Sequence, residues 1–271
     1  MKALFFDLDG TLLDGEKKIP PSAVETLRAA RARGLKVYVA TGRSLRTERM
    51  LGWTTETTLF DGGVYSNGAC ICLDGQAEYV TIAPEAVRAA IDEAGRYPDV
   101  HLSVNGEGAI HAFNYRPPEF ILGPWGITPQ DIIPLDEMAV RQATKVLIFY
   151  KELVNSTRPL PEDLFPRLQA RAGSLATMYL TDQGATIQLV PKESSKRAGI
   201  LSICERMGYA PEEIAVFGDD LNDLEMIRTF PVSVAMGNGA EEVKAAAKYV
   251  TLPNDEGGIA YALKNVLHII E

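Results

Sequence analysis

The sequence predicts an α/β fold that is interrupted by an inserted α+β segment, and three observations support this. Short apolar segments alternate with amphipathic ones near both ends of the chain, an order typical of parallel sheets. Between about residues 83 and 189, hairpin patterns replace this alternation. Acidic residues and glycines follow directly after several apolar segments. We therefore expect an α/β domain of residues 1–82 and 190–271 and an α+β domain of residues 83–189.

Composition limits the classes of partner. The chain has 271 residues, of which 46% are hydrophobic, and a formal net charge of -9. An acidic chain is a poor partner for nucleic acid, because phosphate backbones attract basic surfaces. No apolar run approaches the length of a membrane span, and Asp7 comes too early for a signal peptide. We expect a cytoplasmic protein, with Cys70, Cys72 and Cys204 as ordinary reduced thiols, since zinc would need further ligands.

The first apolar segment, Ala3–Phe6, is too short for a helix and suits a fully buried strand. It runs into Asp7 and Asp9, and Gly10 then ends the strand. Two carboxylates beside a buried strand are costly to desolvate unless a cation or hydrogen-bond donors await them. This pair is the first indication of a functional site.

A strand–helix–strand unit follows. Ser22 and Glu25 form a Ser-x-x-Glu capping box, apolar residues continue at helical spacing, and Gly34 suits the position beyond the helix end. The β-branched segment 35–40 predicts a strand that ends in Thr41-Gly42-Arg43. Two parallel strands are implied, so Asp7 and Thr41 are expected at one sheet edge, where open α/β sheets bind ligands.

The inserted segment has a different pattern. A helix is predicted over residues 84–94, with Pro84 in its first turn, and a hairpin over residues 100–113. A loop-rich stretch with Tyr115, Arg116 and Trp125 comes next. The remaining expected elements are a strand over 145–150, a weak helix over 162–171 interrupted by Pro166, and strands near 174–181 and 186–190.

The α/β alternation then resumes. We expect a helix over 196–207, a strand over 214–217 that runs into Gly218-Asp219, and a short helix over 224–229. Strands over 232–235 and 249–251, a helix over 240–247 and a terminal helix over 259–270 complete the prediction. Lys196 and the acidic residues Asp219 and Asp223 therefore converge with Asp7 and Thr41 at the carboxyl edge of the sheet.

These residue types suit phosphoryl transfer. Four acidic side chains offer the oxygen ligands that Mg²⁺ prefers, and Asp219 with Asp223 would complete a metal site begun by Asp7. Asp7 can be the nucleophile, because a carboxylate needs no general base, with its repulsion of phosphate offset by Mg²⁺ and Lys196. Asp9 can be the general acid and base if its pKa is raised in a closed site. The Thr41 hydroxyl and Gly42 amide can hold phosphoryl oxygens.

Each feature alone also has an ordinary structural explanation. Asp9-Gly10 can be a simple turn, Thr41-Gly42-Arg43 a helix-capping loop, Lys196 a solvated helix residue, and Asp219-Asp220 an acidic turn. A calcium loop starting at Asp7 is excluded, because Leu12 and Lys18 stand where glycine and glutamate are required. Together, and in this order, the features favour a site.

The motifs resemble a known family. Asp7-Leu-Asp9-Gly-Thr-Leu, Thr41-Gly42-Arg43, Lys196 and Gly218-Asp219-x-x-Asn222-Asp223 are similar to the four motifs of the haloacid dehalogenase-like phosphatase superfamily. The tail, with Val234-Ala-Met-Gly and Asn254-Asp-Glu-Gly-Gly, resembles its Cof-type (class IIB) hydrolases. Arg197 departs from the family pattern, which usually has glycine after the motif lysine.

This resemblance implies a Rossmann-like parallel-sheet core with an inserted C2-type cap. It implies Mg²⁺ on Asp7, the Asp9 main-chain carbonyl and Asp219, with Asp223 in support, and an aspartyl-phosphate on Asp7. A phosphate-binding set of Leu8, Thr41, Gly42, Lys196 and Asn222 is expected. Asn67-Gly68 also looks like a family turn, for which turn formation is a sufficient explanation. A cap would select the leaving group and close about hinges near 82–84 and 190–193.

Three functional hypotheses follow. The first is a Mg²⁺-dependent phosphatase of small phosphomonoesters, with sugar phosphates, nucleotides and phosphorylated cofactors all open as substrates. The second is a sugar phosphomutase of the same superfamily. The third is a non-catalytic phospholigand-binding protein, against which the presence of both Asp7 and Asp9 argues. Tyr115, Arg116 and Trp125 are candidates for cap contacts with the substrate or for core packing. The sequence leaves the oligomeric state open.

Overall fold

The computed structural model describes residues 1–123, 125–150 and 158–270. The chain forms two compact units, one of Met1–Glu78 and Ser195–Glu271 and one of Tyr79–Ser194. We call them the first unit and the inserted unit. The first is built on a mostly parallel sheet with helices, and the inserted unit is α+β, so the predicted fold class is confirmed. Among the described helices, none has both the length and the apolar character needed to cross a membrane.

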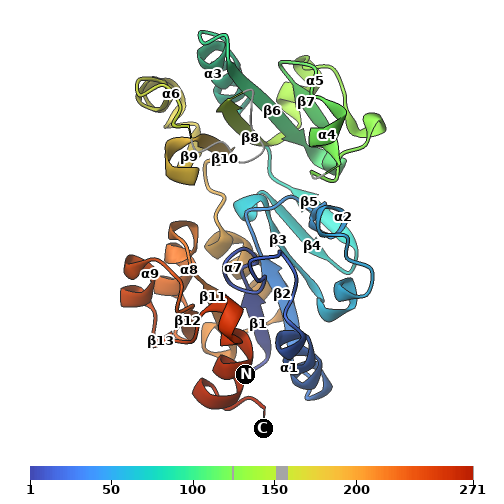
Figure 1. The fold of residues 1–271 in the computed structure, drawn as a ribbon, viewed down its shortest axis with the longest axis vertical. Helices are drawn as coiled ribbons and strands as arrows, with labels where there is room; N and C mark the ends of the chain where they lie inside the picture. The colour runs from blue at the N-terminus through green and yellow to red at the C-terminus, as the bar shows by residue number, and fades with distance from the viewer. Residues whose placement is uncertain (124, 151–157, 271) are drawn as a thin grey trace. The chain divides into compact units, whose positions relative to one another are not determined.

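The sheet of the first unit has eight strands in the order β13-β12-β11-β1-β2-β3-β4-β5, with β1 between β2 and β11 (Figure 1). The strands from β13 to β3 pair in parallel, and β4 is antiparallel to β3. Their bounds are β1 Ala3–Phe6, β2 Lys36–Ala40, β3 Gly62–Tyr65, β4 Cys70–Leu73, β5 Gln76–Tyr79, β11 Ile214–Gly218, β12 Ser233–Ala235 and β13 Tyr249–Val250.

The central strand β1 is buried along its whole length because both of its faces pack against other elements. On one face, Phe5 stacks on Tyr38 with ring centroids 4.8 Å apart. Helices α7 (Lys196–Met207) and α8 (Leu224–Thr229) pack apolar side chains into this same core. On the other face, Phe6 stacks on Phe217 of β11 at 4.5 Å. Burial on both faces explains the uninterrupted apolar run that ends at Asp7.

Two helix ends of the first unit differ from the prediction. Helix α1 (Pro21–Ala32) begins at Pro21 without a side-chain cap, so the Ser22 capping box is wrong: the fixed φ of Pro21 starts the helix two residues earlier. The predicted terminal helix is too long, because α10 (Gly258–Tyr261) continues only through a π-helical turn at Ala262–Val266. The remaining helices of this unit are α2 Thr47–Leu51 and α9 Glu241–Ala246.

The inserted unit has a five-stranded sheet in the order β7-β6-β8-β10-β9. The described pairings between these strands are antiparallel, and apolar side chains of the strands and helices form a large core. The bounds are β6 Val100–Gly106, β7 His111–Phe113, β8 Ala143–Tyr150, β9 Ala176–Thr181, β10 Thr186–Pro191, α3 Pro84–Ala94, α4 Glu119–Leu122, α5 Glu137–Arg141 and α6 Leu164–Ala172. Pro166 does not interrupt α6, because it lies in the first turn, where no intrahelical N–H is lost.

The loop-rich stretch of the inserted unit forms a second, smaller apolar cluster. Tyr115 and Trp125 pack against Phe113, Leu122 and Ile127, which makes core packing their observed role, whereas Arg116 is exposed. The segments expected as hinges lie within this unit: Ile82 is fully buried in its core, and residues 190–191 end β10. The three cysteines of the chain are free thiols.

Candidate active site

Asp7 lies immediately after β1, where the strand continues its pairing with β11. Its main-chain N–H donates to the carbonyl of Phe217 at 3.0 Å, and its own carbonyl accepts from Leu12 N–H at 3.3 Å. The side chain is only 5% exposed. Because β1 is the centre of a parallel sheet, its carboxyl end lies beside the ends of β2 and β11, where such sheets bind ligands.

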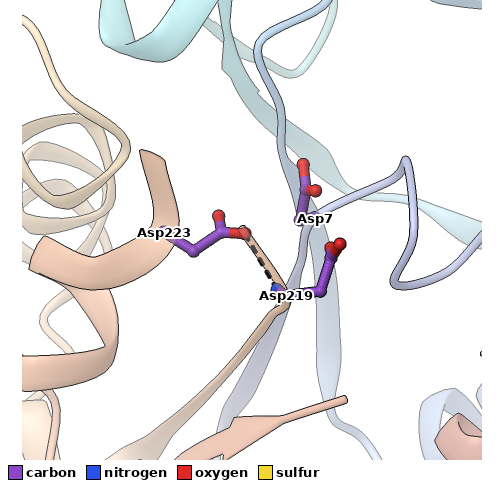
Figure 2. A group of neighbouring side chains, drawn as sticks. All are labelled: Asp7, Asp219 and Asp223. Carbon is purple, nitrogen blue, oxygen red and sulfur yellow. Dashed lines mark hydrogen bonds between the residues drawn. The ribbon is translucent and has the colours of Figure 1, made fainter. Parts of the chain in front are cut away.

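Three carboxylates meet at this edge. Each of Asp7, Asp219 and Asp223 offers an oxygen within 4.8 Å of the other two (Figure 2). They come from three segments: the end of β1, the end of β11 and the short helical turn of residues 221–223. Lys196, the first residue of α7, contacts two of them, with Nζ 2.7 Å from Asp7 Oδ1 and 2.6 Å from Asp223 Oδ1. The predicted convergence of these four residues is present.

The electrostatics of this group show a shortage of positive charge. Burial raises the pKa of Asp7 well above its ordinary value, Lys196 opposes the rise, and the charges of Asp223 and Asp219 add to it. Burial likewise raises the pKa of Asp219 to about 6, although the Thr11 hydroxyl lowers it. Burial alone would lower the pKa of Lys196, but Asp223 and Asp7 hold it above its usual range. One ammonium group therefore does not balance the two buried carboxylates of Asp7 and Asp223 and the half-buried carboxylate of Asp219.

Backbone donors and close packing fix the carboxylates in place. Asp223 Oδ2 accepts the main-chain N–H groups of Asp219 at 3.0 Å and Asp220 at 3.1 Å. The Thr11 hydroxyl donates to Asp219 Oδ1 at 2.7 Å. Gly10 is required beside them: its φ is +76°, and a Cβ there would lie 2.2 Å from Asp219 Oδ2. The acidic side chains are thus held by the fold.

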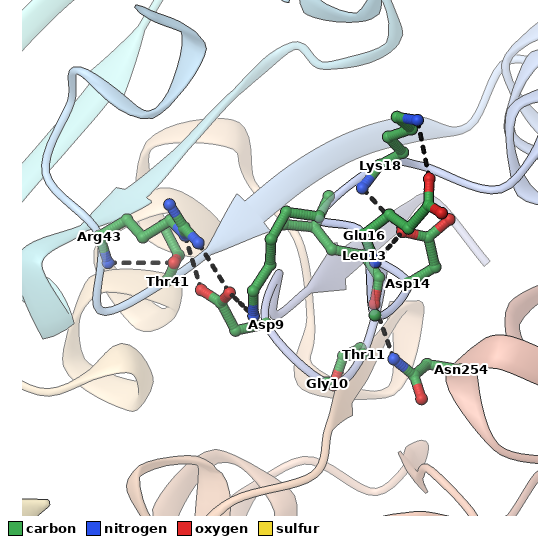
Figure 3. A network of polar contacts seen from close by, with 12 residues as sticks. Asp9, Gly10, Thr11, Leu13, Asp14, Glu16, Lys18, Thr41, Arg43 and Asn254 are labelled. Atoms are coloured by element: carbon green, nitrogen blue, oxygen red, sulfur yellow. Dashed lines mark hydrogen bonds and ion pairs between the residues drawn. The ribbon is translucent and has the colours of Figure 1, made fainter. Parts of the chain in front are cut away.

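Asp9 lies in a different environment from the buried cluster. Arg43 donates two hydrogen bonds to its carboxylate, from Nε to Oδ2 at 2.6 Å and from Nη2 to Oδ1 at 2.8 Å (Figure 3). Lys17 Nζ lies 2.8 Å from the same Oδ1. Partial burial alone would raise the pKa of Asp9, but Arg43 and then Lys17 lower it to about 2. The raised pKa expected for Asp9 is therefore wrong for this conformation, because two cations stabilise the carboxylate.

Variants of Arg43 test how much its two parallel hydrogen bonds to Asp9 contribute to the free energy of unfolding. We expect Arg43→Lys to retain the charge but lose one of the two parallel hydrogen bonds, and Arg43→Ala to lose both. Since the Asp9 side chain is 40% exposed, the loss for the alanine variant should be only about 1 kcal/mol in the free energy of unfolding, with lysine in between. Urea unfolding measures this order. A lysine variant as stable as the wild type would show that charge alone matters.

The other predicted phosphate-binding residues surround this edge. Thr41 is 1% exposed, and its hydroxyl accepts the main-chain N–H of Arg43 at 3.1 Å. The Asn222 side chain donates to Asn67 Oδ1 at 3.2 Å, and the Asn67 amide packs against Gly42. The Leu8 side chain is fully buried in the core, so only its main chain is available for a phosphate.

A second set of contacts ties the C-terminal motif to the loop after β1. Asn238 Nδ2 donates to Gly10 O at 2.8 Å. Asn254 Nδ2 donates to Leu13 O at 2.7 Å, as Figure 3 shows. Asp255 Oδ1 accepts the Gly15 N–H at 2.8 Å. The sequence pattern did not predict these contacts. These residues carry amide and carboxylate groups at loop positions of a glycine-rich tail, and this pattern could have indicated hydrogen bonds to a neighbouring loop.

Asp14 lies in the loop after β1 and accepts hydrogen bonds within its own turn. Its Oδ1 accepts the main-chain N–H groups of Glu16 and Lys18, both at 2.9 Å (Figure 3). Such an arrangement is an Asx-type turn, in which a short side chain replaces a backbone acceptor. Asp14 therefore shapes the turn that carries Lys17, the partner of Asp9.

Comparisons with known proteins agree with the geometry. The family model for haloacid dehalogenase-like hydrolases matches residues 4–263. The protein named "Putative phosphatase YkrA" of Bacillus subtilis (strain 168) is 31% identical over 276 residues, covering 98% of this chain and 97% of the relative. The 5-amino-6-(5-phospho-D-ribitylamino)uracil phosphatase YitU of the same organism is 29% identical over 274 residues, covering 95% and 94%.

Solved structures give the same result. The structure described as the HAD subclass IIB sugar phosphatase BT4131 superposes with a TM-score of 0.81 at 30% identity, covering 100% of both chains. The family resemblance predicted from the four motifs is thereby confirmed. The matched segment runs from β1 to the C-terminal helix and includes Asp7, Lys196, Asp219 and Asp223. The chain belongs to the haloacid dehalogenase-like hydrolase family.

Proposed function

We propose that this protein is a Mg²⁺-dependent phosphatase of small phosphomonoesters that works through an aspartyl-phosphate on Asp7. One observation carries the proposal: carboxylate oxygens of Asp7, Asp219 and Asp223 lie within 4.8 Å of one another. Lys196 contacts two of these carboxylates. A nucleophilic carboxylate, a cation site and a fixed ammonium group are the parts that phosphoryl transfer to aspartate requires.

The residues fit a divalent metal ion. All three side chains are hard oxygen donors. Burial and the neighbouring carboxylates raise the pKa values of Asp7 and Asp219, so a bound cation would stabilise their ionised forms. Asp7, Asp219 and the main-chain carbonyl of Asp9 would hold the ion, with Asp223 in support. When bound, Mg²⁺ would supply charge that stabilises the ionised Asp7 and the phosphoryl oxygens.

The chain's own residues divide the reaction. An Asp7 carboxylate oxygen attacks phosphorus, and the bond from phosphorus to the leaving oxygen breaks while protonated Asp9 gives its proton to that oxygen. Asp9, now a carboxylate, takes a proton from water, and the resulting hydroxide attacks the aspartyl-phosphate to release inorganic phosphate and free Asp7. The ion pairs of Asp9 with Arg43 and Lys17 stabilise its carboxylate form, which exists between the two steps. For the first step, Asp9 must therefore leave both cations and take up a proton.

The phosphoryl group would be held by donors from three segments. The Thr41 hydroxyl and Gly42 amide, the Asn222 amide, Lys196 and the main chain at Leu8 form this proposed set. Lys196 has a second function here, because its contact with Asp7 offsets the repulsion between a carboxylate and a phosphate dianion.

The relatives guide the choice of substrate class. YitU is named as a phosphatase of a ribityl-linked phosphomonoester, and BT4131 is described as a sugar phosphatase. We therefore propose sugar phosphates first, followed by nucleotides and phosphorylated cofactors. Residues 1–82 and 190–271 would be the catalytic core, and residues 83–189 a cap that selects the leaving group.

A phosphomonoester panel tests the activity. Purified protein with Mg²⁺ should release inorganic phosphate from p-nitrophenyl phosphate and, faster, from at least one metabolite in a panel of sugar phosphates, nucleotides and phosphorylated cofactors. No release from any compound would refute the proposal. A sugar monophosphate supplied with a bisphosphate activator that is converted to an isomer, without free phosphate, would instead identify a phosphomutase.

Removal of the metal should abolish turnover. We expect chelation by EDTA to stop phosphate release and excess Mg²⁺ to restore it. Asp219→Asn should weaken Mg²⁺ activation by roughly tenfold or more, because one charged ligand is lost. Asp220→Asn is the matched control: this neighbouring carboxylate is exposed and caps its own turn. Equal Mg²⁺ dependence of both variants would contradict the assigned ligand.

The pH dependence of stability gives an independent test. Asp219 has a folded-state pKa of about 6 against an ordinary 3.8, so the folded chain binds this proton more tightly than the unfolded chain does. Its contribution to metal-free stability is therefore present at low pH and lost as pH rises through about 6. Mg²⁺ should relieve this loss. The rise in Tm on adding Mg²⁺ should be larger at about pH 7.5 than at about pH 5; an equal rise would contradict the site.

A further inference from the structure

We propose that Asn67 is a positioning residue of the phosphate-binding site, which fixes the Asn222 side chain against the Gly42 loop. This inference rests on the proposed function, because the groups that it positions are those assigned to the phosphoryl oxygens. Three independent features of the turn after β3 support it.

The first feature is an unusual backbone. Ser66, Asn67 and Gly68 are three successive residues with positive φ, at 50°, 52° and 95°. Left-handed backbone is unfavourable for residues with a Cβ, least so for asparagine, and it occurs mostly as single residues. Ser66 and Asn67 are each only 3% exposed, whereas an ordinary turn lies at the surface. A buried strained turn is retained when its surroundings require it.

The second feature is the set of main-chain contacts made by this turn. Ser66 N–H donates to Arg43 O at 2.8 Å, and Asn67 N–H donates to Thr41 O at 3.1 Å. The turn thus holds both ends of the Thr41-Gly42-Arg43 segment. Gly68 packs against the start of helix α7. A Cβ at Gly68 would lie 2.3 Å from the carbonyl oxygen of Ser195, the residue that caps α7 directly before Lys196.

The third feature is the place of the Asn67 side chain. Its Oδ1 accepts a hydrogen bond from Asn222 Nδ2 at 3.2 Å. A Cβ built on Gly42 would lie 3.2 Å from the same oxygen and 3.4 Å from Nδ2. The Asn67 amide therefore separates the Gly42 main chain from Asn222 and sets the spacing of two groups proposed to bind phosphate.

Another turn of the first unit provides a contrast. Asp74-Gly75, in the hairpin between β4 and β5, has a similar backbone, with φ of 50° and 75°. It is exposed, and a Cβ on Gly75 would meet nothing within 4 Å. Turn formation alone explains Asp74-Gly75. It does not explain the buried contacts of Asn67.

The experiment is a double-mutant cycle on Asn67 and Asn222. Asn67→Gly removes the amide but keeps a residue that accepts positive φ, so backbone strain is not added. It is compared with Asn222→Ala, with the double variant and with Asp74→Gly as the matched turn control. The readouts are kcat and KM for release of inorganic phosphate, the affinity for inorganic phosphate by calorimetry, and Tm.

We expect Asn67→Gly to lower kcat/KM by roughly 10- to 100-fold and to weaken phosphate binding, because small displacements of binding groups have effects of this size. The double variant should be no worse than the more damaged single variant, since Asn67 acts through Asn222. Asp74→Gly should match the wild type in both readouts. A loss of Tm without a change in kinetics or phosphate affinity would show a structural role only and overturn the inference.

Two further outcomes separate this inference from the proposed function. If the effects of the two single variants multiply in the double variant, Asn67 does not act through Asn222, and the inference fails while the phosphatase stands. If the wild type binds phosphate but releases none from any substrate, the proposed activity fails, and the four phosphate affinities still decide the role of Asn67. A wild type that does neither refutes both.

Discussion

Asp7→Asn is expected to reduce turnover by about 10⁴-fold or more while leaving the fold intact. An amide of the same shape cannot form the acyl phosphate, so the first step is lost. Stability should be equal to or higher than that of the wild type, because Asp7 is a buried carboxylate that shares the Lys196 ammonium group with Asp223 and also lies beside Asp219. Phosphate release with Mg²⁺ and thermal unfolding measure the two effects.

The control for Asp7→Asn is Asp14→Asn. Asp14 follows in the same loop but only accepts main-chain N–H groups of its own turn, a task that asparagine also performs. It should keep wild-type turnover. Acid quenching during turnover of a ³²P-labelled substrate should trap label on the wild type in a form released by hydroxylamine, and none on Asp7→Asn. Wild-type turnover in Asp7→Asn would exclude Asp7 as the nucleophile.

Lys196→Met should have the largest effect on stability, about 3–5 kcal/mol, and should also abolish turnover. Methionine has a similar length but leaves the carboxylates of Asp7 and Asp223 without the ammonium group that lies 2.7 and 2.6 Å from them. The loss should shrink as pH falls, because protonation removes the unpaired charges. Urea unfolding as a function of pH measures it, with exposed Arg197→Met on the same helix as the control.

A second variant separates charge imbalance from a simple packing defect. Lys196→Met combined with Asp7→Asn removes one of the unpaired carboxylates, so the double variant should regain part of the lost stability while remaining inactive. If the double variant is less stable than Lys196→Met alone, the defect comes from packing, and the assigned role of the buried ammonium group is wrong.

The position of the candidate site could be predicted from the sequence because it depends mainly on the topology of the sheet. Asp7, Thr41 and Asp219 each follow a strand, and a parallel sheet brings the carboxyl ends of its strands to one edge. Lys196 was placed correctly as well, since helix α7 begins at this residue even with Arg197 after it. No side-chain detail was needed for these predictions.

The partners of Asp9 and Asn67 could not be predicted in the same way. Arg43 and Lys17 are long side chains on loops, and no periodic pattern shows where their ends lie. Their effect is large, because they reverse the direction of the expected pKa shift of Asp9. Asn67 was explained by turn formation alone, since burial of a turn cannot be recognised from its sequence.

Local rules also failed where two of them competed. Ser22 and Glu25 satisfy the spacing of a capping box, but Pro21 already provides a helix start, and the helix begins there. Helices α4 and α5 of the inserted unit and strand β5 of the first unit's sheet were missed because elements of four or five residues contain too few positions to show a period.

The loop after β1 is held by hydrogen bonds to residues that are translated much later than the loop itself. Thr11 bonds to Asp219, 208 positions along the chain, and the loop carbonyls of Gly10 and Leu13 bond to residues 228 and 241 positions away. Asp7 is therefore translated well before strand β11 and the asparagines that hold its loop. A nascent chain cannot assemble the site until these later segments have emerged from the ribosome, so synthesis itself delays its assembly.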